Sequence, residues 1–242
     1  MKQNMNAYTA QDQLVWRTLF ERQFTNLQGK VSEAYLDALK EMSPVMHAHK
    51  IPDFREMDEW FAARTGWKME VVPGLIPVDE FFRLLAEKRF CSSTWLRSME
   101  QLDYLEEPDM FHDTFGHVPL LSNPVFSRFM QTFGELGCQV MHEPEKLAAL
   151  QRLYWFTIEF GMIAGTHQLI YGAGIISSFG ETNRAVSAVV EHRPFVLEEV
   201  LEMPFRTDVV QEQYVCIHGF EQLFGSIQQL TEQWTSITVP GN

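Results

Sequence analysis

The sequence has 242 residues, of which 45% are hydrophobic and 21% charged, and this composition suits a single globular domain, residues 1–242, with a substantial core. Its formal net charge of -13 opposes binding to a phosphate backbone, so we expect small-molecule ligands and no nucleic-acid partner. No apolar run reaches the roughly 18 residues of a membrane span, and residues 1–12 lack a secretory signal, so we expect a cytoplasmic protein without membrane contact.

The first part of the chain is predicted to be helical. Apolar residues at helical spacing predict helices over residues 12–27 and 32–42. An extended loop is expected to follow over residues 47–52. Its two histidines, His47 and His49, have no third ligand nearby, so we interpret them as a solvated pair rather than a metal site.

The remaining elements are mostly helices, with little strand-like sequence. Helices are predicted over residues 57–64, 78–88, 124–140, 144 to about 163, and 220–234, and short strands over residues 68–72, 169–171 and 213–217. The predicted fold class is mainly α, with a few short strands near the functional loops. Cys91, Cys138 and Cys216 form no CxxC pair, so we expect three buried thiols and no disulfide framework.

The most informative segment lies between residues 107 and 119, where His112 and His117 are five positions apart. A regular α-helix would turn the two rings about 140° apart, unlike the pair of an HExxH motif. Gly116 and Pro119 let the chain leave regular helix, so the second ring could reach the same ion from just beyond the helical turn. Without a third ligand, two hydrogen-bonded loop histidines remain the alternative.

Glu159 supplies the candidate third ligand. It sits within residues 153–163, which are apolar on almost every side, and a buried carboxylate needs a cation, a hydrogen-bond donor or a metal. An ion pair with arginine is the simple alternative. Two imidazoles and one carboxylate bind Fe(II) in many oxygenases but also zinc in some hydrolases, so the residues alone leave the metal open.

Three longer motifs carry a family resemblance. The segments EPDMFHDTFGHVPLL, YWFTIEFG and YGAGIISSFGE resemble the signatures of the pterin-dependent aromatic amino acid hydroxylases, most closely the bacterial phenylalanine-hydroxylating branch, and the resemblance covers about residues 12–224. It implies that His112, His117 and Glu159 bind Fe(II). It also implies that a tetrahydropterin, tetrahydrobiopterin or a related reduced pterin, supplies two electrons while dioxygen supplies the oxygen atom for an aromatic ring.

The same resemblance implies which residues bind the substrate. Arg97 resembles the arginine that holds the substrate carboxylate, and Asp109 is its expected partner. Trp155 and Phe160 resemble walls of the substrate pocket, and Ser177 resembles a serine that is hydrogen-bonded to a ligating histidine. The alternatives are a surface ion pair for Arg97 and simple core packing for the aromatic residues.

For the pterin, the backbone of Gly74, Leu75 and Ile76 resembles the loop that meets the pterin ring, and Phe81 resembles the aromatic residue that stacks on it. Tyr154 resembles a tyrosine near iron and pterin, and Asp113 stands where the animal enzymes carry a glutamate beside the pterin. Leu105 stands in place of a threonine that is associated with the substrate backbone in the animal enzymes. Glu181 fits either an acid near the ligands or a helix start, and the sequence does not separate the two.

The resemblance implies L-phenylalanine as substrate and L-tyrosine as product. Hydroxylation of tryptophan, or of phenylalanine at the meta position, remains open at this point, as do a zinc-dependent hydrolase with the same three ligands and a non-catalytic metal- or pterin-binding module. The sequence lacks the regulatory domain and the tetramerisation helix of the animal enzymes, so we expect a monomer or a dimer.

Overall fold

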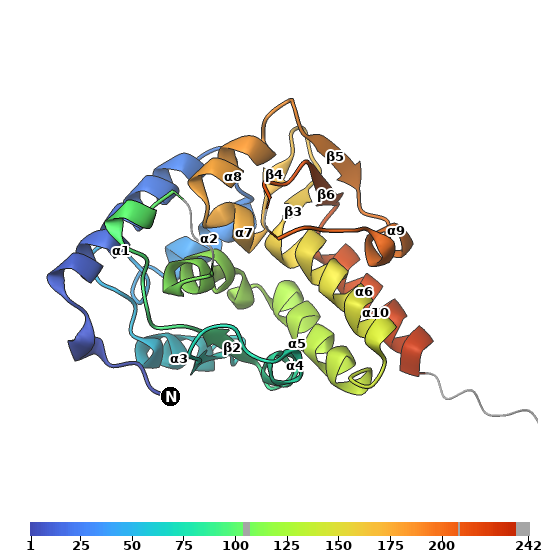
Figure 1. Cartoon of the computed structure of the whole chain (residues 1–242), viewed down its shortest axis with the longest axis horizontal. Helices are drawn as coiled ribbons and strands as arrows, with labels where there is room; N and C mark the ends of the chain where they lie inside the picture. The colour runs from blue at the N-terminus through green and yellow to red at the C-terminus, as the bar shows by residue number, and fades with distance from the viewer. Residues whose placement is uncertain (104–106, 208, 236–242) are drawn as a thin grey trace, which may run out of the picture.

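The computed structural model describes residues 1–103, 107–207 and 209–235, and it is mainly helical, as predicted (Figure 1). The helices are α1 (Ala10–Leu27), α2 (Glu33–Glu41), α3 (Phe54–Ala62), α4 (Val78–Ala86), α5 (Pro124–Gln139), α6 (Pro144–Tyr154), α7 (Ala173–Ile176), α8 (Phe179–Ala185), α9 (Leu197–Glu202) and α10 (Phe220–Thr235). Short 3-10 turns are η1 (Met5–Ala7), η2 (Met99–Gln101) and η4 (Pro119–Ser122), and two π-helical turns are η3 (His112–His117) and η5 (Trp155–Glu159).

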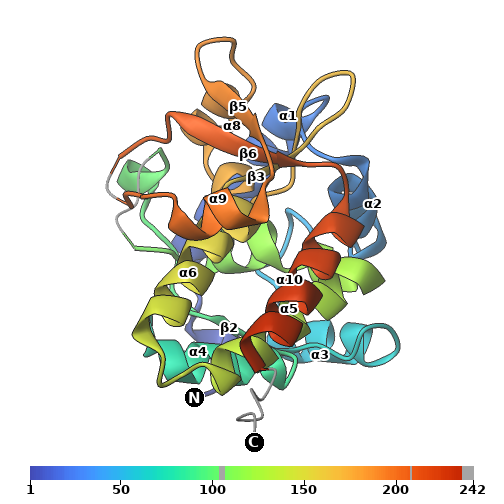
Figure 2. The same cartoon turned by 90° about the vertical axis from the view of Figure 1, so that its right-hand side faces the viewer.

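The strands of the described residues form two small sheets. They are β1 (Lys68–Val71), β2 (Arg89–Ser92), β3 (Gly161–Ile163), β4 (Leu169–Ile170), β5 (Glu191–Pro194) and β6 (Gln213–Ile217). β1 and β2 pair in parallel, and the other four follow the order β4-β3-β6-β5, with β3 antiparallel to β4 and parallel to β6. Figure 2 shows β2 and the four-stranded sheet at opposite ends of the view, with α5, α6 and α10 between them.

Local capping explains why the predicted N-terminal helices begin where they do. Thr9 and Asp12 form a reciprocal capping box at the start of α1, and Ser32 accepts the Tyr35 backbone N–H at the start of α2. α3 begins three residues earlier than predicted, because Asp53 caps it by accepting the backbone N–H of Arg55. Each cap satisfies a backbone donor that a helix start otherwise leaves free.

The core lies where long amphipathic helices approach each other closely. α5 packs between α4 and α10, and its Gly137 faces Phe82 of α4. A Cβ at Gly137 would lie 2.0 Å from Phe82 Cδ1, so a larger residue there would force the two helices apart. This packing supports α4, which runs directly from the candidate pterin loop.

The predicted helix over residues 144–163 is wrong at its C-terminal end. α6 stops at Tyr154, η5 widens the backbone to Glu159, and residues 161–163 form β3 instead. Gly161 lies against the Tyr171 side chain, with a Cβ position only 2.2 Å from Tyr171 Oη, and β3 gains backbone partners in β4 and β6. Pairing with distant strands therefore overrides the helical pattern of the sequence.

Two further expectations need correction. β2 and β5 were not predicted. The burial of β2 alternates along the strand, but one of its two buried residues is the polar Ser92, and β5 has no buried residue. Cys138 is exposed on α5 and Cys91 is only partly buried, whereas Cys216 is buried as expected. All three thiols are free, as the absence of a CxxC pair predicts.

Candidate metal centre and its cavity

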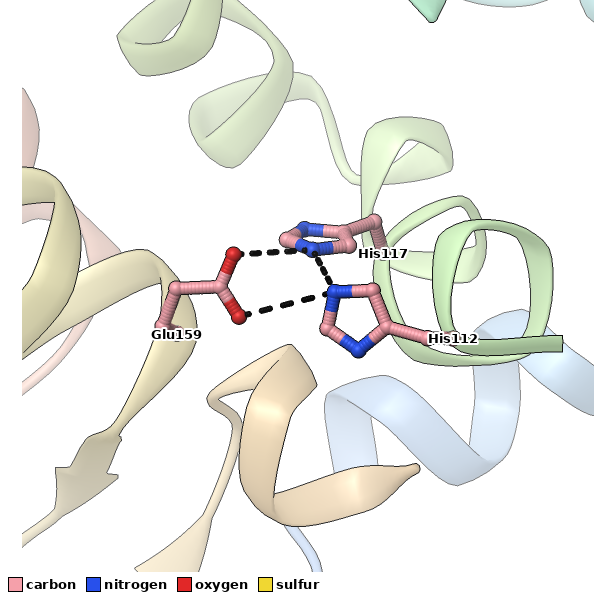
Figure 3. Close-up of side chains that lie close together, drawn as sticks. All are labelled: His112, His117 and Glu159. Atoms are coloured by element: carbon pink, nitrogen blue, oxygen red, sulfur yellow. Dashed lines mark hydrogen bonds and ion pairs between the residues drawn. The ribbon is translucent and has the colours of Figure 1, made fainter. Parts of the chain in front are cut away.

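Three side chains that can bind a metal converge between two helical segments (Figure 3). His112 and His117 come from η3, and Glu159 comes from the end of η5. His117 Nε2 lies 3.2 Å from His112 Nε2 and 3.2 Å from Glu159 Oε1, and His112 Nε2 lies 3.8 Å from Glu159 Oε2. Within the described residues this is the one group of three or more potential ligands whose ligand atoms all lie within 4.8 Å of one another, close enough to share one ion.

The five-residue spacing of the histidines is explained by the π-helical turn. A π-helix closes its hydrogen bonds from residue i to i+5, so residues five positions apart are one turn apart and point to nearly the same side. The chain leaves the regular α-helix here, as expected, but both histidines lie within one widened turn, so the second ring does not lie beyond it. Gly116 serves close packing instead, since a Cβ there would lie 2.9 Å from the Ala173 carbonyl oxygen.

The widened turn is supported from α2. Tyr35 is fully buried, and its hydroxyl donates a 2.6 Å hydrogen bond to the Phe115 carbonyl, in the middle of η3. A buried carbonyl without a donor would be costly, so this contact stabilises the irregular backbone that carries both histidines.

Ser177 determines how the His112 ring presents its nitrogens. The Ser177 hydroxyl donates to the Ala173 carbonyl at 2.8 Å, so its oxygen is left to accept a hydrogen bond from His112 Nδ1, also at 2.8 Å. His112 then carries its proton on Nδ1 and directs the Nε2 lone pair toward His117 and Glu159. This is the tautomer that a metal ligand requires.

Burial and charge give these side chains the forms that bind a cation. Burial lowers the pKa of His112 to about 4, so its ring is neutral at pH 7. Burial opposes ionisation of Glu159, but the attraction of His117 and His112 outweighs it and lowers the pKa of Glu159 to about 2. The partners of Glu159 are thus the two histidines and not an arginine.

The arrangement fits a divalent transition metal. Ligand atoms about 2.1 Å from one ion and at right angles to each other are about 3.0 Å apart, close to two of the three separations found here. Three protein ligands on one side leave further positions for small molecules. This donor set suits Fe(II) and also zinc, so the geometry alone does not choose between them.

Arg97 and Asp109 form a buried, bidentate ion pair. Arg97 Nε lies 2.9 Å from Asp109 Oδ2, Arg97 Nη2 lies 2.8 Å from Asp109 Oδ1, and the side chains are 7% and 0% exposed. Burial alone would raise the pKa of Asp109, but the hydrogen bonds and charge of Arg97 lower it. Asp109 also accepts the His112 backbone N–H at 3.1 Å, so this is no surface ion pair.

A cavity of about 450 Å³ opens beside the three potential ligands. His112, His117, Glu159 and Trp155 line it. The six residues expected to bind a pterin also line it, namely Gly74, Leu75, Ile76, Phe81, Asp113 and Tyr154. Burial raises the pKa of the Asp113 carboxyl to about 7, although that carboxyl accepts the Ser93 backbone N–H at 2.9 Å.

Four other predicted residues lie around the cavity without lining it: Arg97, Asp109, Phe160 and Ser177. Phe160 packs against Trp155, with ring centroids 4.6 Å apart, and therefore acts on the cavity through that neighbour. His47 and His49 have ring centroids 6.0 Å apart and belong to no three-ligand group of the described chain. Leu105 lies outside the described residues.

Several cavity residues were missed by the sequence reasoning. Cys91 lies in β2, a strand that the sequence did not predict. Phe133 lies on α5, where its sequence position resembles that of an ordinary core residue. Phe205 and Thr207 lie in the segment after α9, far along the chain from the ligands, where no local pattern marks them. Glu181 lies in the first turn of α8, where the Ser178 side chain accepts its backbone N–H, and its carboxylate accepts the Tyr214 hydroxyl at 2.6 Å.

Comparison with known proteins extends this picture over the whole fold. A family model for biopterin-dependent aromatic amino acid hydroxylases matches residues 3–237. A phenylalanine-4-hydroxylase from Ralstonia nicotianae is 43% identical over 226 residues, covering 93% of this chain and 71% of that protein.

Solved structures of a Chromobacterium violaceum phenylalanine hydroxylase share the fold. The cobalt-bound form has a TM-score of 0.90 at 41% identity and covers 94% of this chain and 82% of that one. A form with iron(III) and oxidised 7,8-dihydrobiopterin has a TM-score of 0.89 at 41% identity, with coverage of 98% and 86%. The likeness therefore extends well beyond the three motifs.

Proposed function

This chain belongs to the biopterin-dependent aromatic amino acid hydroxylases, and we propose that it converts L-phenylalanine to L-tyrosine as a phenylalanine 4-monooxygenase. Its cofactors are Fe(II) and a tetrahydropterin, tetrahydrobiopterin or a related reduced pterin, and dioxygen is the co-substrate. When bound, iron and pterin supply the redox chemistry, in which the pterin gives two electrons and dioxygen gives one oxygen atom to the ring. The observation that carries the proposal is the convergence of His112, His117 and Glu159 on this cavity.

In this proposal the three converging side chains hold the iron. His112 and His117 bind through Nε2, and Glu159 binds through its carboxylate. Ser177 keeps the His112 proton on Nδ1, which leaves Nε2 free to bind. The apolar surroundings of η5 keep water away from the side of Glu159 that faces the core.

Arg97 is the proposed binding group for the substrate carboxylate. Asp109 occupies the Nε and Nη2 side of the guanidinium, so the edge formed by Nη1 and Nη2 remains for a second bidentate contact, to the substrate carboxylate. Asp109 also holds the His112 backbone, so the carboxylate-binding group and a metal ligand share one support. Trp155 provides aromatic surface for the substrate ring, and Phe160 supports that surface by packing against Trp155.

The pterin is proposed to bind where Phe81 and the loop of Gly74, Leu75 and Ile76 line the cavity. Phe81 and Tyr154 lie edge to face with centroids 5.3 Å apart, and the Tyr154 ring stacks 6.3 Å from His117. Phe81 therefore offers a flat ring for a pterin, and Tyr154 separates it from the metal ligands. The backbone of Gly74, Leu75 and Ile76 and the carboxyl of Asp113 offer polar contacts for the edge of the pterin.

Product analysis with phenylalanine, tyrosine and tryptophan in parallel tests the function. Protein reconstituted anaerobically with Fe(II), then supplied with tetrahydropterin and air, should form L-tyrosine from phenylalanine. Hydroxylated tryptophan or meta-tyrosine as main product would overturn the substrate or the position of attack. Hydrolytic activity of the zinc-loaded protein, with no hydroxylated product from the iron-loaded protein, would favour a hydrolase. Pterin binding without pterin-dependent oxygen uptake would favour a non-catalytic module.

Three broader features belong to the same proposal. We place the enzyme in the cytoplasm, as one catalytic domain that works as a monomer or a dimer. Cell fractionation and light scattering on the purified chain test these points. In the described part of the chain, no helix is both long enough and apolar enough to cross a membrane.

A further inference from the structure

Gln211 is a nearly buried residue whose backbone is fixed by α8. It lies two residues before β6, and 8% of it is exposed. Its backbone N–H donates to Glu181 Oε1 at 3.3 Å, and its carbonyl accepts from Arg184 Nε at 2.8 Å. Glu181 is itself held by the Tyr214 hydroxyl at 2.6 Å, so the position of the Gln211 backbone is determined from two elements.

The side chain of Gln211 is equally constrained. Its Nε2 donates to the carbonyls of Arg206 at 3.2 Å and Val209 at 3.0 Å, which uses both N–H groups of the amide. The amide oxygen must then point the other way. There it accepts the indole N–H of Trp155 at 3.2 Å, so every polar group of Gln211 has a partner.

Trp155 carries this constraint to the cavity. Its ring stacks on Phe205 with centroids 5.0 Å apart and an interplanar angle of 29°, and both residues line the cavity. Gln211 therefore holds both parts of this wall: Trp155 by its indole N–H, and the chain segment of Phe205 through the carbonyl of the next residue, Arg206. An indole without a hydrogen-bond partner can occupy either of two broad orientations about its second side-chain torsion.

We propose that Gln211 is a positioning residue, which sets the aromatic wall of Trp155 and Phe205 against which the substrate ring binds. The inference rests on the proposed function for the identity of that ring. Trp155 also opens η5, where its carbonyl accepts the Phe160 N–H at 3.0 Å, and Glu159 ends the same turn. Gln211 thus links the substrate wall to the segment that carries a metal ligand, and within the described residues its own hydrogen bonds reach neither the metal ligands nor the residues proposed to bind the pterin.

Gln211→Met keeps the length of the side chain and removes all three of its hydrogen bonds. We expect the KM for phenylalanine to rise about tenfold, the loss that one or two net hydrogen bonds produce. The KM for tetrahydropterin and the affinity for Fe(II) should change less than twofold, and less tyrosine should form per pterin oxidised. Gln213→Met is the matched control, because Gln213 lies two residues away with only a 3.5 Å contact to Arg193.

A double-variant cycle with Trp155→Phe tests whether Gln211 acts through the indole. In the Trp155→Phe background, which has no indole N–H, Gln211→Met should raise the KM for phenylalanine less than threefold further. The inference would be overturned if the fold increase in KM of the double variant equalled the product of the increases of the two single variants. It would also be overturned if folded Gln211→Met had a KM for phenylalanine within twofold of the wild-type value. Should Gln211→Met not fold, Gln211→Asn, which is too short to span both contacts, takes its place with the same expected pattern.

A readout that does not need activity separates this inference from the proposed function. In protein labelled with fluorotryptophan, the fluorine resonance of Trp155, assigned by its loss in Trp155→Phe, should shift or broaden in Gln211→Met and stay in place in Gln213→Met. An unmoved resonance contradicts the positioning role, whatever the activity. If the wild-type protein forms no tyrosine but the Trp155 resonance shifts in Gln211→Met, the proposed function would be contradicted and the structural role of Gln211 supported.

Discussion

Ser177→Ala offers a sharp test of how the metal site is built. The substitution removes the oxygen that accepts from His112 Nδ1 at 2.8 Å and leaves that N–H without its partner. The ring can then turn or change tautomer, and loss of such a contact typically lowers metal affinity about 10- to 100-fold, or about 1.4 to 2.7 kcal/mol. Anaerobic titration of Fe(II) against a competing chelator measures the change directly.

Ser226→Ala provides the matched control for this experiment. Ser226 also donates to a carbonyl four residues earlier, that of Gln222 at 2.8 Å, but it lies on α10. Both variants lose the same local contact, and only Ser177→Ala loses the contact with His112. Equal Fe(II) affinity in the two variants would refute the account of Ser177 as the residue that fixes the His112 tautomer.

Two further predictions concern the supports of the site. Tyr35→Phe strips the Phe115 carbonyl of its 2.6 Å donor and should lower the free energy of unfolding by about 1 to 3 kcal/mol in urea titrations; a loss below about 0.5 kcal/mol would contradict the role given to Tyr35 in supporting η3. Arg97→Lys keeps the charge but not the planar fork, so the KM for phenylalanine should rise at least about tenfold with an unchanged KM for tetrahydropterin, whereas equal changes in both would point to general loss of structure.

Much of the regular structure could be predicted because its signals are local. Ser32 caps α2 where that helix was predicted to begin, and Gln213–Ile217 forms the predicted strand β6, whereas α1 begins at Ala10, two residues before its predicted start. The candidate ligands could be singled out for a similar reason. A carboxylate among apolar residues, such as Glu159, needs a partner wherever the fold places it.

The geometry of the site could not be predicted, because it depends on contacts between distant segments. The π-helical turn that aligns His112 with His117 is supported by Tyr35 from α2 and by the close approach of α7 to Gly116. Phe205 reaches the cavity by packing on Trp155, fifty residues earlier in the chain. Spacing rules for regular helices and strands do not take contacts between distant segments into account.

We propose that iron held by His112, His117 and Glu159 directs oxygen from dioxygen to the ring of phenylalanine. The most direct measurement follows tyrosine formed in an atmosphere of labelled dioxygen by Fe(II)-reconstituted wild type and by His112→Ala, each with tetrahydropterin. Wild type should give singly labelled L-tyrosine, and the variant should lose iron binding together with product. Unlabelled tyrosine, or full activity in His112→Ala, would contradict the account.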